Sequence, residues 1–276
     1  MDHARRRLWR GRDAPGGRLV GVRHPLTALV ACAAAVVLGA CSAVGTVATA
    51  AGVSLVILIA ALGWPQLLGA PARTSLTIVL AATGLLATWA VVIWPLEDGG
   101  RPVLLEPIAI CIALGAIAAF MVQLIRGHGR PQRLESTAGT ITGVAGIASA
   151  AGWTALARWQ ELTDGAAGAL QLSLAASLGL AALCALLPGA RLLGRVLGLL
   201  LAAAAPFVLV QLLPDLPLWS AVVGGTLAGL VTVLIGSLVS SETRRPAGLR
   251  ASLALGVAPV ALTGLLAYVV LRIMTV

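Results

Sequence analysis

Long apolar runs separated by short polar or basic segments make up most of the chain. Cutting the sequence at Pro, Gly and charged clusters leaves nine apolar segments, at residues 25–44, 47–64, 74–94, 103–125, 136–157, 167–187, 196–213, 219–240 and 251–271. Each is close to the roughly 20 residues with which an α-helix crosses a bilayer. The alternation typical of a membrane-spanning strand is absent. The pattern predicts an all-α, polytopic bundle of about nine transmembrane helices.

The only ambiguous boundary lies in the stretch 26–64, which has no charged side chain. It fits one long pass, two passes, or a removable leader that ends in the lipobox-like sequence LGAC at 38–41. We favour two passes with a turn near 42–49. Cleavage and lipidation at Cys41 stay open, because they would still leave residue 41 on the outer side.

Arginine sets the expected orientation, because cytoplasmic loops are enriched in Lys and Arg. With two passes in the stretch 26–64 and a cytoplasmic N-terminus, sixteen of the 19 basic residues lie inside. They are Arg5, Arg6, Arg7, Arg10, Arg12, Arg18, Arg23, Arg73, Arg126, Arg130, Arg133, Arg191, Arg195, Arg244, Arg245 and Arg250. We therefore expect residues 1–24 to be an Arg-rich, disordered cytoplasmic tail and residues 25–272 to be the membrane domain.

Composition supports a membrane protein. The chain has 59% hydrophobic and 11% charged residues, against about 45–50% and 25% in soluble domains. Its net charge of +9 does not indicate nucleic-acid binding, because the arginines lie between apolar runs and not on one folded face. We expect membrane lipids as partners, and a membrane protein or a second copy of the chain as a further partner. The four cysteines have no CxxC spacing and no nearby His, so we expect no metal site and no cofactor.

Catalytic chemistry has few candidates, since the chain has no HExxH, GxSxG or Walker-type motif. The densest polar stretch is RGHGRPQRLESTAGT at 126–140. Its arginines and a helix N-terminus fit a phosphate or an anionic headgroup, while Ser136 is suited to cap the next helix. The candidate ligand-binding residues are Arg126, Arg130, Arg133, Glu135 and Ser136. The alternative is an ordinary positive-inside loop with a capped helix.

Small residues and prolines give two further signals. Three GxxxG pairs predict close helix packing within a compact bundle or across a dimer. They are Gly139 with Gly143, Gly194 with Gly198, and Gly225 with Gly229. Pro206 and Pro259 are predicted to lie roughly 14–17 Å from the cytoplasmic edge, near the middle of the hydrocarbon core. Paired helix kinks mark transport paths in many transporters, although proline is also tolerated in membrane helices without a function.

The tryptophans and glutamines of the apolar segments are expected to have structural roles. Five tryptophans fall at predicted helix ends, which is typical of anchoring at the membrane interface. They are Trp64, Trp94, Trp153, Trp159 and Trp219. Gln123, Gln171 and Gln211 are expected to form hydrogen bonds between helices, with contact to a substrate as the alternative.

The sequence GWPQLLGAPART at 63–74, expected to form a turn, the basic leader and GRPQRLEST at 129–137 together resemble uncharacterised multi-pass proteins of actinobacterial envelopes. The resemblance implies a multi-pass protein of the cytoplasmic membrane in a high-GC Gram-positive cell. It implies no activity and assigns no functional residue.

Three functions remain open at this point. The leading hypothesis is a permease-like protein that moves or presents a small amphipathic or lipid-linked molecule, with the kinks at Pro206 and Pro259 as its motivation. The alternative is a non-catalytic partner that stabilises an envelope complex through its glycine-rich faces. The third is a membrane enzyme acting on a lipid headgroup, which has only outside acids such as Asp98 and Asp164 to work with.

Overall fold

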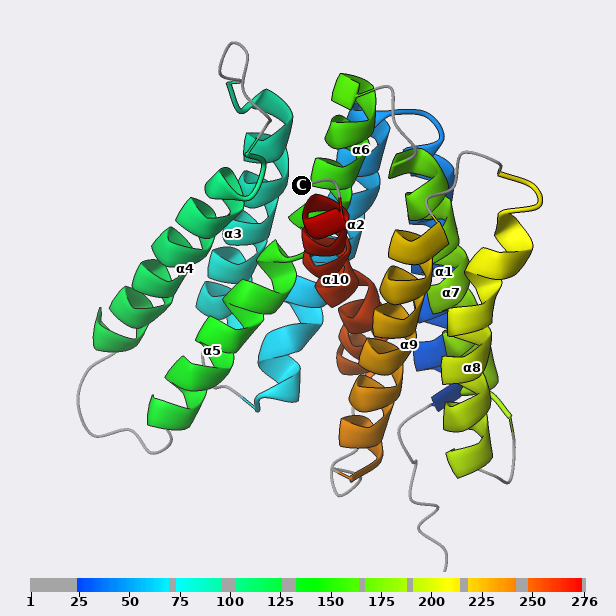
Figure 1. The fold of residues 1–276 in the computed structure, drawn as a ribbon. Coiled ribbons are helices and arrows are strands. Elements are labelled where there is room, and N and C mark those ends of the chain that lie inside the picture. The colour runs from blue at the N-terminus through cyan, green and yellow to red at the C-terminus, as the bar shows by residue number, and fades with distance from the viewer. Residues whose placement is uncertain are drawn as a thin grey trace, which may run out of the picture.

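The structure, a computed structural model, describes residues 24–69, 73–95, 103–125, 133–163, 167–187, 191–213, 218–241 and 248–274. These residues form ten helical segments and no strand (Figure 1). The segments are α1 (His24–Ser42), α2 (Thr46–Leu67), α3 (Arg73–Ile93), α4 (Glu106–Ile125), α5 (Arg133–Ala148), α6 (Ala151–Thr163), α7 (Ala167–Cys184), α8 (Arg191–Leu209), α9 (Leu218–Ser241) and α10 (Leu249–Met274). The expected tail, 1–24, lies almost wholly outside the described residues.

Eight spans in the described residues are long and apolar enough to cross a membrane, and one of them, Thr137–Leu162, comprises both α5 and α6. The apolar part of α7, Gly168–Cys184, is shorter. At 1.5 Å per residue it covers about 25 Å, which is near the lower limit for a membrane crossing. The predicted all-α bundle of about nine transmembrane helices is therefore confirmed. The chain is a multi-pass membrane protein.

Two separate helices, α1 and α2, confirm the prediction of two passes in the stretch 26–64. The turn between them is closed by the Ser42 hydroxyl, which donates to the carbonyl of Gly39 (2.7 Å), and by the amide of Gly45, which donates to the carbonyl of Cys41 (3.2 Å). Gly45 has φ 139°, a conformation that favours glycine because it has no Cβ. Cys41 lies in the last turn of α1, and its processing stays a prediction.

Two predicted boundaries are wrong. The predicted turn at 63–74 begins too early, because α2 continues through Pro65 to Leu67. The predicted segment 136–157 is divided, since α5 ends at Ala148 and α6 begins at Ala151 and extends to Thr163. The apolar sequence continues without a change of pattern past residue 64 and past the break at 148–151, so the sequence pattern indicates neither boundary.

Tight packing against α10 accompanies the break between α5 and α6. At the break the amide of Gly152 donates to the carbonyl of Ser149 (3.1 Å), so the bond spans three residues and not four. A Cβ on Gly152 would overlap the backbone of Gly264 and Leu265 in α10. The indole N–H of Trp153 donates to the carbonyl of Val260 in the same helix (2.8 Å). The chain therefore turns where it meets α10 most closely.

Figure 1 shows α10 near the middle of the bundle, with α3, α4 and α5 on one side of it and α1, α7, α8 and α9 on the other. Helix α10 packs against α1, α2, α6 and α9. The broken span Thr137–Leu162 is also central, with 78% of its most apolar 18 residues buried, against 28% for the spans of α4 and α8. The large exposed apolar side chains of α4 and α8 therefore form the surface that a bilayer covers.

The two ends of the bundle differ in charge. We call the end that carries Arg73, Arg195 and Arg250 the arginine-rich end; it lies at the bottom of Figure 1. The opposite end carries Arg158 and Glu161.

Candidate functional site

The anionic site predicted at 126–140 falls largely outside the described side chains. Arg126 and Arg130 lie outside the described residues, and only the backbone of Arg133, Glu135 and Ser136 is described. Since α5 already includes Arg133, Ser136 lies inside the first turn and does not occupy the capping position expected from the sequence. The ligand role of these residues stays a prediction.

The glycines of the three predicted GxxxG pairs all face neighbouring helices of the same chain. The neighbour is α7 for Gly194 and Gly198 and α8 for Gly225 and Gly229. Gly143 faces Trp64 in α2, and Gly139 faces Leu68, the residue that follows α2. This placement accounts for packing within the bundle, so the dimer that the sequence also allowed finds no support in these glycines. The close approach of each helix pair depends on the missing side chains.

Each pair meets its neighbour at short range. A Cβ on Gly143 would overlap the indole of Trp64, whose N–H donates to the carbonyl of Gly139 (3.0 Å). A Cβ on Gly198 would lie 3.3 Å from the carbonyl oxygen of Ala181 in α7. One on Gly229 would lie 2.8 Å from the Cβ of Ala202 in α8. These glycines therefore lie where helices of the chain approach closely, and their role in packing stays a prediction.

Pro206 lies inside α8, where its missing N–H leaves the carbonyl four residues earlier without its helical donor. That carbonyl belongs to Ala202, and the buried hydroxyl of Ser177 in α7 donates to it (2.9 Å). The cost of Pro206 is thus offset by a hydrogen bond between helices, as is common for proline in membrane helices.

Pro259 has a different environment, because it lines a cavity of about 420 Å³. The cavity lies within a ring of five helices, α1, α7, α8, α9 and α10, in which each helix packs against the next and α10 packs against α1. Pro259 is ten residues into α10, about 15 Å along its axis, so the cavity extends from the arginine-rich end to this depth in the bundle.

The cavity forms because α9 leaves α7 as it approaches the arginine-rich end. Near the other end of α9, a Cβ on Gly224 would lie 2.7 Å from the side chain of Leu174 in α7, and one on Gly225 would lie 2.8 Å from the Ser177 hydroxyl. At Gly236, which lines the cavity, a Cβ would meet nothing within 4 Å. The helices are therefore closed at one end and open at the other.

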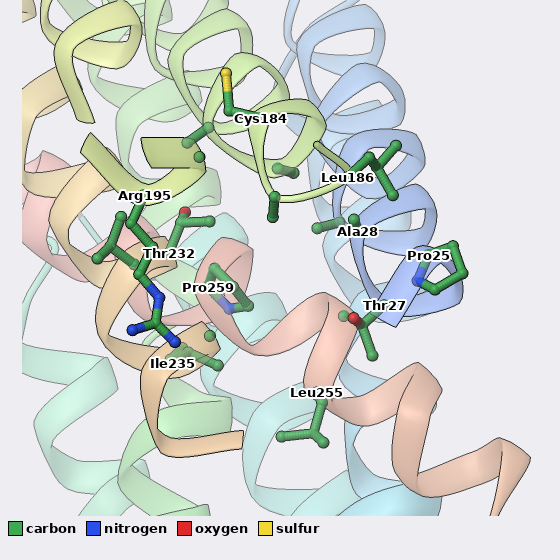
Figure 2. A pocket seen from close by; sticks show the side chains of 18 of the residues that line it. Pro25, Thr27, Ala28, Cys184, Leu186, Arg195, Thr232, Ile235, Leu255 and Pro259 are labelled. Carbon is green, nitrogen blue, oxygen red and sulfur yellow. The ribbon is translucent and has the colours of Figure 1, made fainter. Parts of the chain in front are cut away.

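Most of the cavity wall is apolar, and Arg195 is the one charged residue that lines it within the described part of the chain. Figure 2 shows Arg195, Thr232 and Ile235 on one side of the cavity, with Pro25 and Thr27 on the other. The hydroxyl of Thr232 donates to the carbonyl of Ala228 in its own helix (2.8 Å). This hydroxyl therefore offers a ligand only an acceptor.

Sequence reasoning missed Arg195 as a candidate site residue and counted it only toward orientation. One signal was present: Arg195 lies four residues after Arg191, about 6 Å further along α8 and next to a long apolar run. Its convergence with Pro259 and Gly236 is produced by tertiary packing, which sequence spacing does not reveal.

At the opposite end, α6 joins two other helix termini through charged side chains. The guanidinium of Arg158 donates to the carbonyls of Val91 and Trp94 at the end of α3, the latter at 2.6 Å. A carboxylate oxygen of Glu161 accepts from the amide of Thr46, the first residue of α2 (2.7 Å). A cation at a helix C-terminus and an anion at a helix N-terminus both match the helix dipole.

Aromatic side chains fill the space between α6 and α10 near the same end. The ring of Trp159 meets that of Tyr268 edge-on, with 6.4 Å between centroids, and the guanidinium carbon of Arg272 lies 5.1 Å from the Trp159 ring centroid. Trp159 is 7% exposed and Trp153 is fully buried. The interpretation of these two tryptophans as interface anchors is therefore wrong, because α6 lies inside the bundle.

Gln171 in α7 is also fully buried. Its side-chain amide donates to the carbonyl of Trp153 (2.7 Å), which is the interhelical bond expected of a glutamine in a membrane helix. Among the described residues, no three His, Cys, Asp or Glu side chains lie close enough together to hold a metal ion. The described residue that combines charge with access to a cavity is Arg195.

No protein-family model, curated protein or solved structure matches the chain. The arrangement of the helices and the cavity is therefore the basis for a functional proposal.

Proposed function

We propose that the protein carries or presents a small amphipathic or lipid-linked molecule at the cytoplasmic membrane, and that the molecule occupies the cavity beside Pro259. The observation that carries this proposal is the cavity itself, about 420 Å³ in volume and lined mainly by apolar side chains of five helices. Binding sites for small molecules typically measure about 300–1,000 Å³ and combine an apolar wall with a few polar groups.

A packing defect is a poor explanation for this volume. Voids larger than a water molecule are few in protein interiors, because side chains interdigitate. Elsewhere in the bundle the packing is close enough that a single Cβ on Gly152 or Gly264 would overlap a neighbour. A space of this size beside helices packed so closely favours a site that is filled in the membrane.

The position of Pro259 inside α10 supports a site that changes shape. Proline removes the amide that would bind the carbonyl of Leu255, and Leu255 lines the cavity as well. The part of α10 that follows Pro259 is joined to α6, since the indole N–H of Trp153 donates to the carbonyl of Val260 (2.8 Å). We therefore expect the first half of α10 to move relative to the second half when the ligand enters or leaves.

The two other hypotheses receive less support. A role as an assembly partner relied on glycine-rich faces, yet the three GxxxG pairs are engaged in contacts within the chain. An enzyme that acts on a headgroup would need an acid, a base and a nucleophile in reach of one another. No such set converges among the described residues that line the cavity.

Filling the cavity tests the proposal. Gly236→Leu adds side-chain volume where a Cβ meets nothing within 4 Å, and Ala113→Leu adds the same kind of volume at an exposed position of α4, far from the cavity. We expect native mass spectrometry of gently extracted wild type and Ala113→Leu to show about one bound amphiphile per chain, and Gly236→Leu to show a large loss. Movement of tail-labelled lipid across proteoliposomes would separate carriage from presentation. Equal occupancy in all three proteins would contradict the proposal.

A further inference from the structure

We infer that the molecule bound in the cavity is an uncharged long-chain alcohol, and that its hydroxyl donates a hydrogen bond to the carbonyl of Leu255. The inference rests on the proposed function and names the class of molecule that the cavity would take. The group that recognises this molecule is a backbone carbonyl of α10, which becomes available because a proline follows four residues later.

The carbonyl of Leu255 lies on the cavity face of α10. Leu255 and Pro259 both line the cavity, and in an α-helix the carbonyl of one residue points along the axis toward the amide four residues later. Pro259 has no amide hydrogen, so this carbonyl loses its usual helical donor. A backbone acceptor in a mainly apolar wall costs free energy until a donor binds it.

The other proline inside a helix of the ring shows how such a carbonyl is bound. Pro206 leaves the carbonyl of Ala202 without its helical donor, and the buried hydroxyl of Ser177 in α7 donates to that carbonyl at 2.9 Å. A hydroxyl from outside the helix therefore replaces the missing amide. At Pro259 we propose the same arrangement with the hydroxyl of a ligand in place of a serine.

The hydroxyl that α9 presents beside Pro259 does not fill this role. Thr232 lies nine residues before the end of α9 and Pro259 ten residues after the start of α10, so the two are at similar levels of neighbouring helices, and both line the cavity (Figure 2). The hydroxyl of Thr232 donates to the carbonyl of Ala228 in its own helix (2.8 Å), which uses its one hydrogen. Among the described residues, no side chain donates to the carbonyl of Leu255.

The chemistry of the wall selects an uncharged alcohol. A carbonyl oxygen only accepts, so an ionised phosphate or carboxylate, which also only accepts, gains nothing from it. An ammonium group would donate but would bring a charge, and no Asp or Glu of the described residues lines the cavity to pair with it. A hydroxyl donates without a charge.

The rest of the cavity suits one hydrocarbon chain. Its wall is mainly apolar and includes Ala31, Ala182 and Val233 from three different helices. The volume of about 420 Å³ is near the lower end of the range for small-molecule sites. A single chain therefore fits the cavity better than the two chains of a glycerolipid.

The experiment compares two probes that differ in one hydrogen-bond donor, 1-dodecanol and its methyl ether. Binding of each is measured with the purified full-length protein in a neutral detergent. We expect wild type to bind the alcohol about fivefold more tightly than the ether, which corresponds to one net hydrogen bond. 1-Butanol carries the same hydroxyl on a short chain, and at the same concentration it should not compete with 1-dodecanol.

Two proline variants show which carbonyl recognises the alcohol. Pro259→Ala gives the carbonyl of Leu255 a helical donor, so we expect the alcohol and the ether to bind within about twofold of each other. Pro206→Ala is the matched control, because it makes the same change in α8 at a residue that does not line the cavity. It should keep the preference of wild type. Both variants should fold, since alanine is the better helix former.

Four results would overturn the inference. They are equal binding of the two probes by wild type, an unchanged preference in Pro259→Ala, a preference lost equally in Pro206→Ala, and competition by 1-butanol as strong as that by 1-dodecanol itself. Failure of the proposed function is distinguishable. Gly236→Leu should weaken the binding of both probes if the cavity is the site, and unchanged binding of both in this variant would show that the cavity is not the site.

Discussion

The two ends of the bundle place an arginine next to a membrane helix in opposite ways. At the end away from the arginine-rich end, Arg158 of α6 donates to two carbonyls at the end of α3. The aromatic rings of Trp159 and Tyr268 pack beside α6. At the arginine-rich end, Arg195 lies half-buried in the wall of a cavity that also contains Pro259. The same residue type therefore completes the fold in one region and faces a ligand-sized space in the other.

Proline shows the same contrast. The carbonyl that Pro206 leaves without a helical donor is bound by the Ser177 hydroxyl, so this part of α8 is joined to α7. The carbonyl that Pro259 leaves without one belongs to Leu255, at the cavity wall. The comparison teaches that neither a charged residue nor a proline in a membrane helix indicates function by itself. Its surroundings separate a structural role from a binding role.

Glycine substitutions should give the largest difference between the two regions. Gly152→Leu would drive a side chain into the backbone of α10, so we expect it to prevent folding or to lower the free energy of unfolding by about 3 kcal/mol or more. Gly236→Leu should leave that free energy within about 1 kcal/mol of wild type, or raise it, because leucine is the better helix former. Unfolding titrations in mixed micelles measure both. Similar losses would show that the cavity is not open space.

The second largest difference is expected between substitutions of Arg158 and Arg195, in the free energy of unfolding that each one removes. Arg158→Gln removes a charged donor from the end of α3, and we expect it to lower the free energy of unfolding by about 2 kcal/mol. Arg195→Gln should lower it by less than about 1 kcal/mol in ligand-free protein, because its environment is partly exposed. Thermal unfolding in detergent checks the order of the two. A reversed order would assign Arg195 a structural role.

The smallest expected effect is the coupling between Ser177 and Pro206. Ser177→Ala should cost about 1 kcal/mol, which is typical of an interhelical hydrogen bond in a membrane protein. In a Pro206→Ala background the same change should cost almost nothing, since the new amide can bind the carbonyl of Ala202. A double-mutant cycle isolates this term. Costs that simply add would mean that the hydroxyl does not compensate for the proline.

Much of the fold was predictable because membrane crossing is decided locally. A run of about 20 apolar residues must form a helix in lipid to satisfy its own backbone, whatever its neighbours are. This is why the eight long apolar spans of the described residues follow from the sequence, whereas the separation of α1 from α2 was indicated by the distribution of the arginines. The break between Ala148 and Ala151 was not predictable, because it accompanies the contact between Gly152 and Gly264, which are far apart in the sequence.

The candidate site was predictable only in part. Pro259 stood out because a proline in an apolar run is a local signal, and it proved to line the cavity. Arg195 looked like any other basic residue beside a membrane segment, and Gly236 like any other glycine. Their convergence with Pro259 depends on where α9 separates from α7, which is a property of the packed bundle.

By itself the sequence determined that the chain is a multi-pass helical membrane protein, that its N-terminal apolar stretch holds two helices, and which prolines interrupt the apolar segments. Tertiary structure alone decided which of these features serve packing and which face open space. The physical reason is that a helix in lipid forms its backbone hydrogen bonds within its own segment, so it depends on local sequence. A cavity depends on how the side chains of several helices pack against one another.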